Sequence, residues 1–412
     1  MVFLEARSFV TIVFSSTQNF KSQIFFAIII GMKESLLAAF SVIYRFFAYN
    51  FIFRFDSEKI HELFLSLGKF YSKHLWLFAP FAFWLRPKNV ELTQVISGIT
   101  FKGPIGLAAG FDYRASLPRL LPYLGFGFTI VGTFTNKPYG GNEAPRLGRL
   151  VKSKALLVNK GFKNDGIDSA IKILLNDNFA LPVGLSIGKT NIDEICTQEL
   201  AVADIKDAFS RAECSAASFN YYELNISCPN LKVDVSFYPP ENLEELLGVI
   251  DNLNSNRPVF VKMPIEERDE NILKMLEVIS KHKVEGIVLG NLAKGRSNPA
   301  LLDEEVEKAG KGNFSGMPTQ KRSDELVKLA YENFGDKLTV IGCGGVFTAE
   351  DAYRKIRNGA SLVQIITGLI YNGPLLTAQI NSGLKRLLER DGFGHISEAI
   401  GVDTARGKIC EM

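Results

Sequence analysis

The chain has 412 residues, of which 47% are hydrophobic and 22% charged, and this composition is typical of a globular protein with a large core. The formal net charge of +3 is small for this length, and no basic block interleaved with aromatic residues occurs, so nucleic-acid binding is not expected. The five cysteines and four histidines are scattered and form no C-x-x-C pair. This spacing argues against a disulfide scaffold or a metal site, and an enzyme of this composition is expected to use an organic cofactor.

Residues 1–55 are rich in Phe, Ile and Ala, and charged residues interrupt every apolar run before it reaches the ~18 uncharged residues of a membrane-spanning helix. Glu5 near the start and the lack of a small-residue cleavage site fit a signal peptide poorly. A helix lying in the membrane interface fits better, with Arg45 and Arg54 reaching the headgroups. The alternative is a helix docked on the protein's own core. We treat residues 1–41 as an apolar extension, for which Met32 is an alternative start.

A second helix is expected over residues 56–86, with Asp56 or Ser57 as its cap. Ile60, Leu63, Phe64 and Leu67 mark one apolar face of this helix. Together with the preceding segment it forms the hood, which we define as residues 42–88.

From about residue 100 short apolar, β-branched runs alternate with helical stretches, which predicts parallel βα units. The runs are PIGLAAG, FTIVGT, LLVNKG, PVGLSIG, YYELNIS, PVFVKM, GIVLGN, LTVIGCGG and SLVQIITG. About eight such units close into a (β/α)₈ TIM barrel, with the active site at the carboxyl ends of the strands. A doubly wound sheet is the alternative, but no G-x-G-x-x-G opens a first helix. The barrel is expected over residues 89–388, followed by a polar tail over 389–412.

Polar and glycine residues follow the predicted strands more often than a core requires, which indicates a shared ligand. They are Thr133, Asn159, Ser186, Asn225, Lys262, Asn291, Gly344, Gly345 and Thr367. The glycines and Thr367 follow the seventh and eighth strands, where barrels commonly bind phosphate through backbone N–H groups. A phosphate-bearing cofactor is therefore predicted there.

Lys262 ends an apolar strand, where a buried ammonium needs an anion or an electron-rich ring, such as the edge of a flavin. Asn225, Asn230 and Asn291 offer paired amide donors and acceptors for a small planar ligand. Cys228, followed by Pro229, lies between two of these asparagines and is the candidate catalytic base. The alternative is an inert core thiol.

These stretches together resemble dihydroorotate dehydrogenase, and specifically its membrane-bound, quinone-using class. The resemblance runs from about residue 42 to 388 and rests on motifs in the correct order. They are GPIGLAAGFD, VGTFTNKPYGGNEAPRLGRL, NISCPN, GNFSGMP, IGCGGV and GASLVQIITGLIYNGP. The resemblance implies a barrel that binds FMN, oxidises dihydroorotate to orotate in pyrimidine synthesis, and passes electrons to a membrane quinone through the hood.

Carried over by position, the resemblance assigns each site residue a role. Cys228 is the base; Asn159, Asn225, Asn230 and Asn291 hold the substrate; and FMN is contacted by Ala109, Gly110, Thr133, Ser186, Asn225, Lys262, Gly316, Gly344, Gly345, Ile366 and Thr367.

The sequence also departs from the family pattern. The membrane class usually has serine at the position of Cys228, and cysteine is typical of the soluble class. Tyr113 replaces a usual lysine, Asn159 lies one position late, Ser186 replaces an asparagine and Leu292 a threonine. A different acceptor, a related cyclic substrate or a non-catalytic flavin-binding homologue are the rival hypotheses. A peripheral membrane protein at the cytoplasmic face of the cell membrane is expected.

Overall fold

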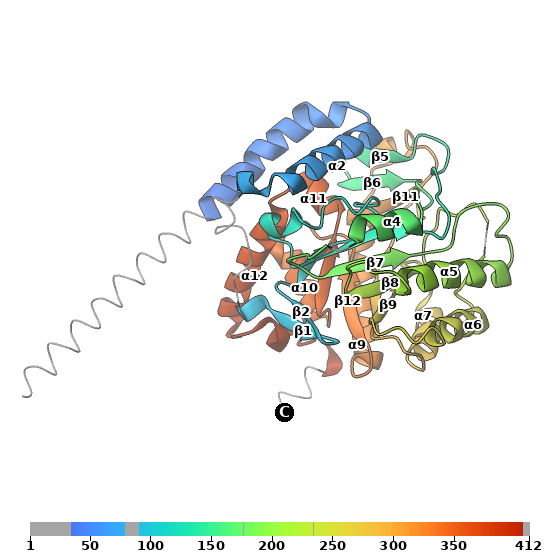
Figure 1. Cartoon of the computed structure of the whole chain (residues 1–412). Coiled ribbons are helices and arrows are strands. Elements are labelled where there is room, and N and C mark those ends of the chain that lie inside the picture. Colours follow the sequence, from blue (N-terminus) through green and yellow to red (C-terminus); the bar gives the residue numbers. More distant parts are fainter. Residues whose placement is uncertain (1–33, 79–89, 176, 234, 407–412) are drawn as a thin grey trace, which may run out of the picture.

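The computed structural model describes residues 34–78, 90–175, 177–233 and 235–406 (Figure 1). The extension up to residue 33 and the end of the hood over residues 79–88 therefore lie outside the described residues. Eight parallel strands form a closed barrel in the order β10-β12-β13-β3-β4-β7-β8-β9. Their bounds are β3 Ile105–Leu107, β4 Phe128–Phe134, β7 Val183–Ile187, β8 Tyr221–Asn225, β9 Val259–Met263, β10 Gly286–Leu289, β12 Thr339–Cys343 and β13 Leu362–Ile365. The predicted TIM barrel is confirmed.

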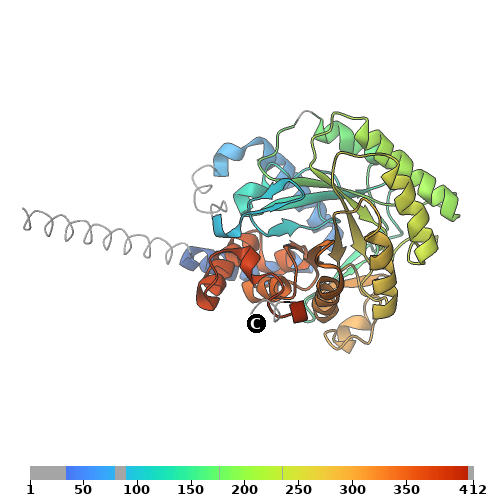
Figure 2. The same ribbon diagram turned by 90° about the horizontal axis from the view of Figure 1, so that it is seen from below.

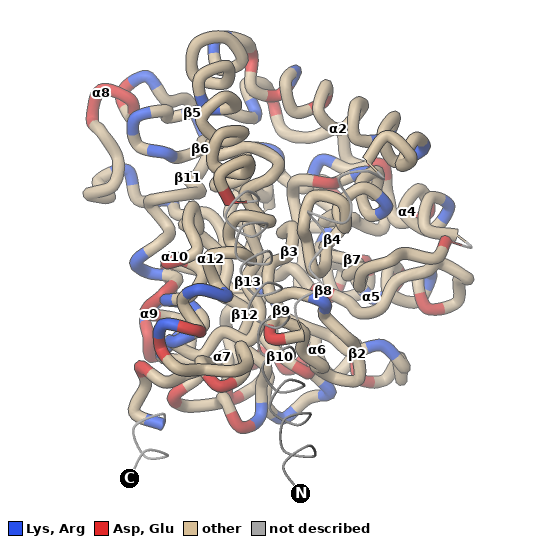
Figure 3. Tube along the Cα trace, turned by 90° about the vertical axis from the view of Figure 1, so that its left-hand side faces the viewer, with Lys and Arg blue, Asp and Glu red and all other residues tan. Residues whose placement is uncertain are grey.

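Helices surround the strands, as the view from below shows (Figure 2). They are α4 Ile167–Leu174, α5 Gln198–Glu213, α6 Pro240–Asp251, α7 Asp269–Ile279, α8 Asp303–Val306, α9 Met317–Phe334, α10 Ala349–Arg357, α11 Thr367–Asn372 and α12 Leu376–Asp391. Short 3₁₀ turns are η1 Ile52–Arg54, η2 Leu75–Phe78, η3 Val90–Leu92, η4 Leu121–Leu124 and η5 Ile396–Ala399. Basic and acidic residues lie side by side around α8, α9 and α10 (Figure 3).

One predicted barrel strand belongs elsewhere. The LLVNKG run overlaps β6 (Ala155–Val158), which pairs antiparallel with β5 (Leu147–Leu150) and β11 (Asn313–Gly316) in a separate sheet. Of the nine apolar runs that the sequence shows, this one is not a barrel strand, because β5 and β6 are an insertion between β4 and β7. Since β5, β6 and β11 all follow carboxyl ends of barrel strands, this small sheet extends the wall of the site.

A cluster of large apolar side chains fills the inside of the barrel. The inner cluster consists of Phe101, Phe128, Ile130, Tyr221, Phe260, Val288, Ile341 and Leu362. The hairpin of β1 (Gln94–Ile96) and β2 (Ile99–Phe101) closes the amino end with Phe101. Gly106 leaves room for Phe128, since a Cβ at Gly106 would lie 2.2 Å from Phe128 Cε2.

Gly106→Val should therefore destabilise the fold. Overpacking a dense core costs typically ~1–3 kcal/mol, and valine cannot move away from a ring held inside a closed barrel. Urea unfolding followed by far-UV circular dichroism should show a lower midpoint. Combining Gly106→Val with Phe128→Leu should recover part of the loss, whereas a strictly additive double variant would contradict the steric explanation.

The hood differs from expectation in where its helix ends and which face it buries. Asp56 caps α2 (Ser57–Lys73) as predicted, accepting a hydrogen bond from Lys59 N at 2.9 Å. The helix ends at Lys73, not at residue 86, because the His74 ring bonds the free carbonyl of Phe70 and His74 leaves the helical conformation. The face packed on the barrel carries His61, Leu65, Gly68 and Ser72, whereas Leu63 and Leu67 of the predicted apolar face are exposed.

The N-terminal helix Glu34–Arg54 lies along α11 and α12. Ser41 Oγ donates to Asn372 O at 3.3 Å, and Tyr44 Oη donates to Ile370 O at 2.9 Å. By its length and composition this helix could cross a membrane, although Arg45 interrupts it. The sequence had predicted that no apolar run in this segment is long enough to do so. Its contacts with the barrel instead hold it against the protein surface.

The residues after α12 also pack on the barrel. Ile396 and Thr404 are buried, and Arg357 of α10 pairs with Asp403 at 2.6 Å. The described part of the predicted polar tail, residues 389–406, is therefore part of the folded domain, and its first three residues belong to α12.

Candidate active site

Three adjoining cavities lie at the carboxyl end of the barrel. The main cavity is lined by residues of the barrel, of the small sheet and of α2, including Ala109, Gly110, Thr133, Asn225, Cys228, Asn230, Lys262, Asn291 and Ile366. The glycine cavity continues from it and is lined by residues that include Gly316, Gly344, Gly345, Ile366 and Thr367. The apolar cavity lies between the hood and the barrel. Most of the predicted site residues are thus brought together.

Cys228 lies in the loop that follows β8. Burial raises the pKa of its thiol to about 12, although the backbone N–H of Asn230 and the Lys262 ammonium both favour the thiolate. The thiol is therefore mostly protonated at neutral pH, and only a small thiolate fraction could act as a base.

The three asparagines around Cys228 are fixed by hydrogen bonds. Asn225 Nδ2 donates to Thr133 Oγ1 at 2.9 Å, and Asn291 Nδ2 donates to Ser227 Oγ at 2.7 Å. Asn230 Oδ1 accepts from Asn313 Nδ2 at 2.6 Å, which leaves the Asn230 amide N–H₂ group as a donor for the cavity. The amides are thereby oriented before a ligand binds.

Lys262, on β9, projects into the barrel beside Glu223 of β8. Its ammonium lies 3.7 Å from Glu223 Oε1, and both side chains are almost fully buried. Burial alone would lower the pKa of Lys262, but the Glu223 carboxylate raises it above its ordinary value. Lys262 therefore presents a fixed positive charge to the main and glycine cavities.

Two predicted contact residues lie one layer behind the cavities. Ser186 is not among the lining residues; its hydroxyl bonds Thr133 Oγ1 at 2.9 Å and Glu223 Oε1 at 3.3 Å. Asn159 is also outside the lining, and its Oδ1 accepts from Asn142 Nδ2 at 3.0 Å. Both residues therefore support the site without facing it.

The glycine cavity has the form of a phosphate cradle. Gly344 and Gly345 have φ of +121° and +66°, and a Cβ on Gly345 would lie 2.3 Å from Gln320 Cβ. Thr367 Oγ1 is hydrogen-bonded to Ser315 Oγ at 2.8 Å, and both residues line this cavity. Gln364 Oε1, on the same lining, is buried without a hydrogen-bond partner. These residues fit a ligand that carries phosphate and further polar groups.

The apolar cavity joins the main cavity through a common wall. Tyr44, Ile52, Ile60 and Phe64 line its hood side. His61, Phe111, Leu147, Leu156 and Ile370 line both cavities. A cavity lined mainly by apolar side chains thus lies between the hood and the main cavity.

The comparisons with known proteins agree with this geometry. The family model "Dihydroorotate dehydrogenase" matches residues 91–388. The chain is 36% identical over 326 residues to the dihydroorotate dehydrogenase (quinone) of Trichodesmium erythraeum, covering 76% of this chain and 84% of that protein. It is 34% identical over 363 residues to the enzyme of the same name from Rhodococcus erythropolis, covering 87% and 98%. The chain belongs to the dihydroorotate dehydrogenase family.

A solved structure agrees as well. The dihydroorotate dehydrogenase of Eimeria tenella, crystallised with ferulenol, superposes with a TM-score of 0.72 at 26% identity, covering 84% of this chain and 96% of that one. The dihydroorotate dehydrogenase family is flavin-dependent, and the cavities described above have the residues to hold such a group.

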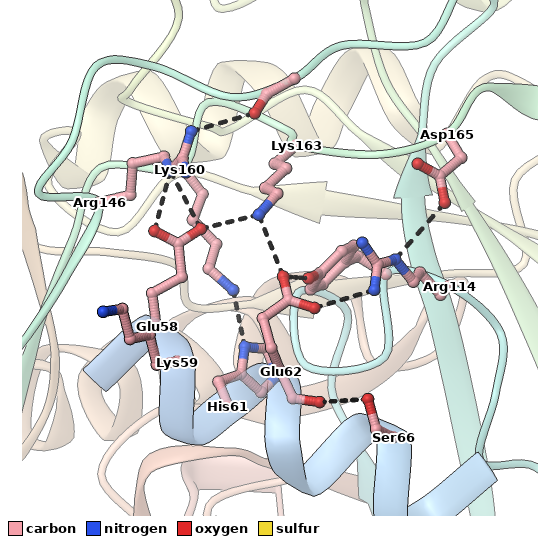
Figure 4. A network of polar contacts seen from close by, with 12 residues as sticks. Glu58, Lys59, His61, Glu62, Ser66, Arg114, Arg146, Lys160, Lys163 and Asp165 are labelled. Atoms are coloured by element: carbon pink, nitrogen blue, oxygen red, sulfur yellow. Dashed lines mark hydrogen bonds and ion pairs between the residues drawn. The ribbon is translucent and has the colours of Figure 1, made fainter. Parts of the chain in front are cut away.

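A charged network between α2 and the main cavity was missed by the sequence reasoning (Figure 4). Lys163 pairs with Glu58 at 2.8 Å and with Glu62 at 3.1 Å. Arg146 pairs with Glu58 at 2.9 Å, and Arg114 pairs with Glu62 at 2.9 Å. The i, i+4 spacing of the two glutamates on a predicted helix was the signal that could have shown a common face.

Tyr113 and Leu292, two departures from the family pattern, line the main cavity. The Tyr113 hydroxyl donates to Glu62 Oε1, and the Lys160 ammonium lies 4.7 Å from the centroid of the Tyr113 ring.

The described residues contain no group of three or more His, Cys, Asp or Glu side chains placed to hold a metal ion.

Proposed function

We propose that this protein oxidises dihydroorotate to orotate with bound FMN, in the de novo synthesis of pyrimidines, and passes the electrons to a membrane quinone. The observation that carries the proposal is the pair of adjoining cavities. A cavity with a thiol, three amides and a buried lysine shares a wall with an apolar cavity that lies under the hood. The first suits a small polar heterocycle and the second an apolar acceptor.

FMN is the flavin that the glycine cavity favours, since Gly344, Gly345 and Thr367 would hold its single phosphate. Ala109, Gly110, Thr133 and Lys262 would line the ring. When bound, FMN would accept a hydride equivalent from the substrate and pass the electrons on to the acceptor. The positive charge of Lys262 favours an electron-rich ring beside it.

Cys228 is proposed as the base that removes the proton from the carbon next to the ring carbonyl. Asn225, Asn230 and Asn291 would hold the ring by its carbonyl and N–H groups, with Cys228 at its face. Because the Cys228 thiol is mostly protonated, the proton transfer depends on its thiolate fraction or on a relay that removes the thiol proton.

The hood is proposed to place the protein on a membrane surface. Of the 21 large apolar side chains that are exposed in the described chain, 15 lie in residues 34–78, including Phe46, Phe47, Leu63 and Trp76. A concentration of this kind marks an interaction surface. We propose a peripheral protein at the cytoplasmic face of the cell membrane, with Arg45 and Arg54 at the headgroups.

The proposal predicts that the purified protein is yellow and contains one FMN. Dihydroorotate should bleach the flavin under anaerobic conditions, and a short-chain ubiquinone or menaquinone should restore the colour. Both steps can be followed by absorbance near ~450 nm, a property of oxidised flavins.

Each of the other possible results would contradict a different part of the proposed function. A colourless protein that does not bind added FMN would end the assignment, and a yellow protein that dihydroorotate does not bleach would favour another substrate or a non-catalytic role. Bleaching without recovery on addition of quinone would indicate a different acceptor.

A further inference from the structure

Lys160 lies just after β6 and lines the main cavity with Cys228 and Asn230. Its ammonium contacts two groups without charge. Nζ donates to His61 Nδ1 at 2.8 Å and lies 4.7 Å from the centroid of the Tyr113 ring. The side chain is thus held in one position at the wall of the cavity (Figure 4).

His61 is neutral in this arrangement. Its Nε2 lies 2.9 Å from Phe111 O, and because a carbonyl oxygen only accepts, Nε2 carries the proton and Nδ1 is free to accept from Lys160. Burial and the nearby Lys160 charge lower the pKa of His61 to about 3. His61 therefore orients Lys160 but gives it no negative charge.

The other lysines of the site have carboxylate partners. Lys163 pairs with Glu58 and Glu62, and Lys262 lies beside Glu223. Within residues 34–406, as far as they are described, Lys160 forms no ion pair with a carboxylate. Two carboxylates, Glu58 and Glu62 of α2, lie near Lys160, but each already pairs with other cations. Glu58 pairs with Arg146 and Lys163, and Glu62 pairs with Lys163 and Arg114.

Lys160 is half-buried, and an ammonium partly removed from water without an anion is costly; a carboxylate brought by a ligand removes that cost. The remaining polar groups that face the main cavity are neutral amides, hydroxyls and a protonated thiol, apart from Lys262 and Lys163. The cavity as a whole is therefore complementary to a planar amide ring that bears one carboxylate.

We infer that Lys160 binds the carboxylate of the substrate, and so makes the site select an acidic pyrimidine over its neutral analogues. This inference rests on the proposed function and names a residue that decides its specificity. His61 and Tyr113 are positioning residues, because they act by holding the ammonium.

The test compares two ligands on the oxidised flavoprotein: orotate, and methyl orotate, in which the carboxylate is a neutral ester. Dissociation constants are measured from the change in flavin absorbance. Lys160→Gln should weaken orotate binding about 10–100-fold, as expected for a lost hydrogen bond to a charged group, and leave methyl orotate within about twofold. Lys59→Gln is the matched control, because this lysine is exposed on α2 and lines neither cavity, and it should leave both constants unchanged.

A second readout is the pH dependence of binding. Burial, opposed by Glu58 and Glu62, lowers the pKa of Lys160 to about 8, so its charge is lost as the pH rises. Orotate affinity of the parent protein should therefore fall about tenfold per pH unit above about pH 8. Lys160→Arg should keep the preference for orotate and lose this dependence, because a guanidinium does not titrate in this range.

The outcomes separate the two proposals. If Lys160→Gln weakens both ligands equally, or neither, Lys160 is a structural residue and the inference fails, although dihydroorotate still bleaches the parent flavin. If the yellow parent protein binds neither ligand and dihydroorotate does not bleach it, the proposed function itself fails.

Discussion

Replacing Cys228 with alanine should slow the reduction of the flavin by dihydroorotate by ~10²–10⁴-fold, the usual effect of losing a general base. FMN should remain bound, because the glycine cavity that would hold its phosphate does not include Cys228. Single-turnover stopped-flow absorbance measures this step without the acceptor. Reduction of the Cys228→Ala flavin at the parent rate would show that Cys228 is only a core thiol.

The same experiment across pH gives an independent signature. Burial raises the pKa of the Cys228 thiol to about 12, so the thiolate fraction grows with pH throughout the accessible range. The rate of flavin reduction should rise about tenfold per unit between about pH 6 and 9 without a plateau, and the residual rate of the alanine variant should be nearly flat. Cys343→Ser is the control, since this thiol lies on the glycine cavity but outside the main cavity.

Filling the apolar cavity should stop electron transfer to the quinone while leaving the first half of the reaction intact. Ile60 lines this cavity but not the main one, so Ile60→Trp should place an indole in the path of the acceptor. We expect a loss of roughly 100-fold or more in reoxidation by a quinone, with flavin reduction by dihydroorotate within about twofold of the parent.

Lys59→Trp provides the matched control, because the neighbouring side chain on the same helix is exposed. Reoxidation should stay close to the parent rate in this variant. If Ile60→Trp is reoxidised as fast as the parent protein, the acceptor does not use the apolar cavity.

Periodicity predicted the barrel because each strand is a short apolar run followed by a turn and a helix. The same signal misplaced β6, since LLVNKG has the composition of a buried strand whichever sheet it joins. Only its pairing with β5 and with β11, which is distant in sequence, shows that this run belongs to the small sheet and not to the barrel. Cys228, Asn225 and Lys262, which motif order singled out, all line the main cavity, because strand ends meet at one rim; their roles stay predictions.

Residues whose role depends on tertiary neighbours were not predictable in this way. Ser186 and Asn159 lie near strand ends like the lining residues, yet Ser186 is bonded to Thr133, which lines the main cavity, and Asn159 is bonded to Asn142. Lys160 and His61 are 99 positions apart in sequence, and neither lies in a run whose pattern indicates an ionisable pair. Their contact appears only when α2 is placed over the small sheet.

The wall shared by the main and apolar cavities has a thermodynamic consequence. His61 faces both cavities and is bonded to Lys160, so a ligand that shifts its ring on one side changes the position of the ammonium on the other. Coupling of this kind is reciprocal: whatever factor an acceptor-site ligand imposes on orotate affinity, orotate imposes on that ligand. An inhibitor that enters from the membrane side would therefore have one potency against the orotate-bound protein and another against the free protein.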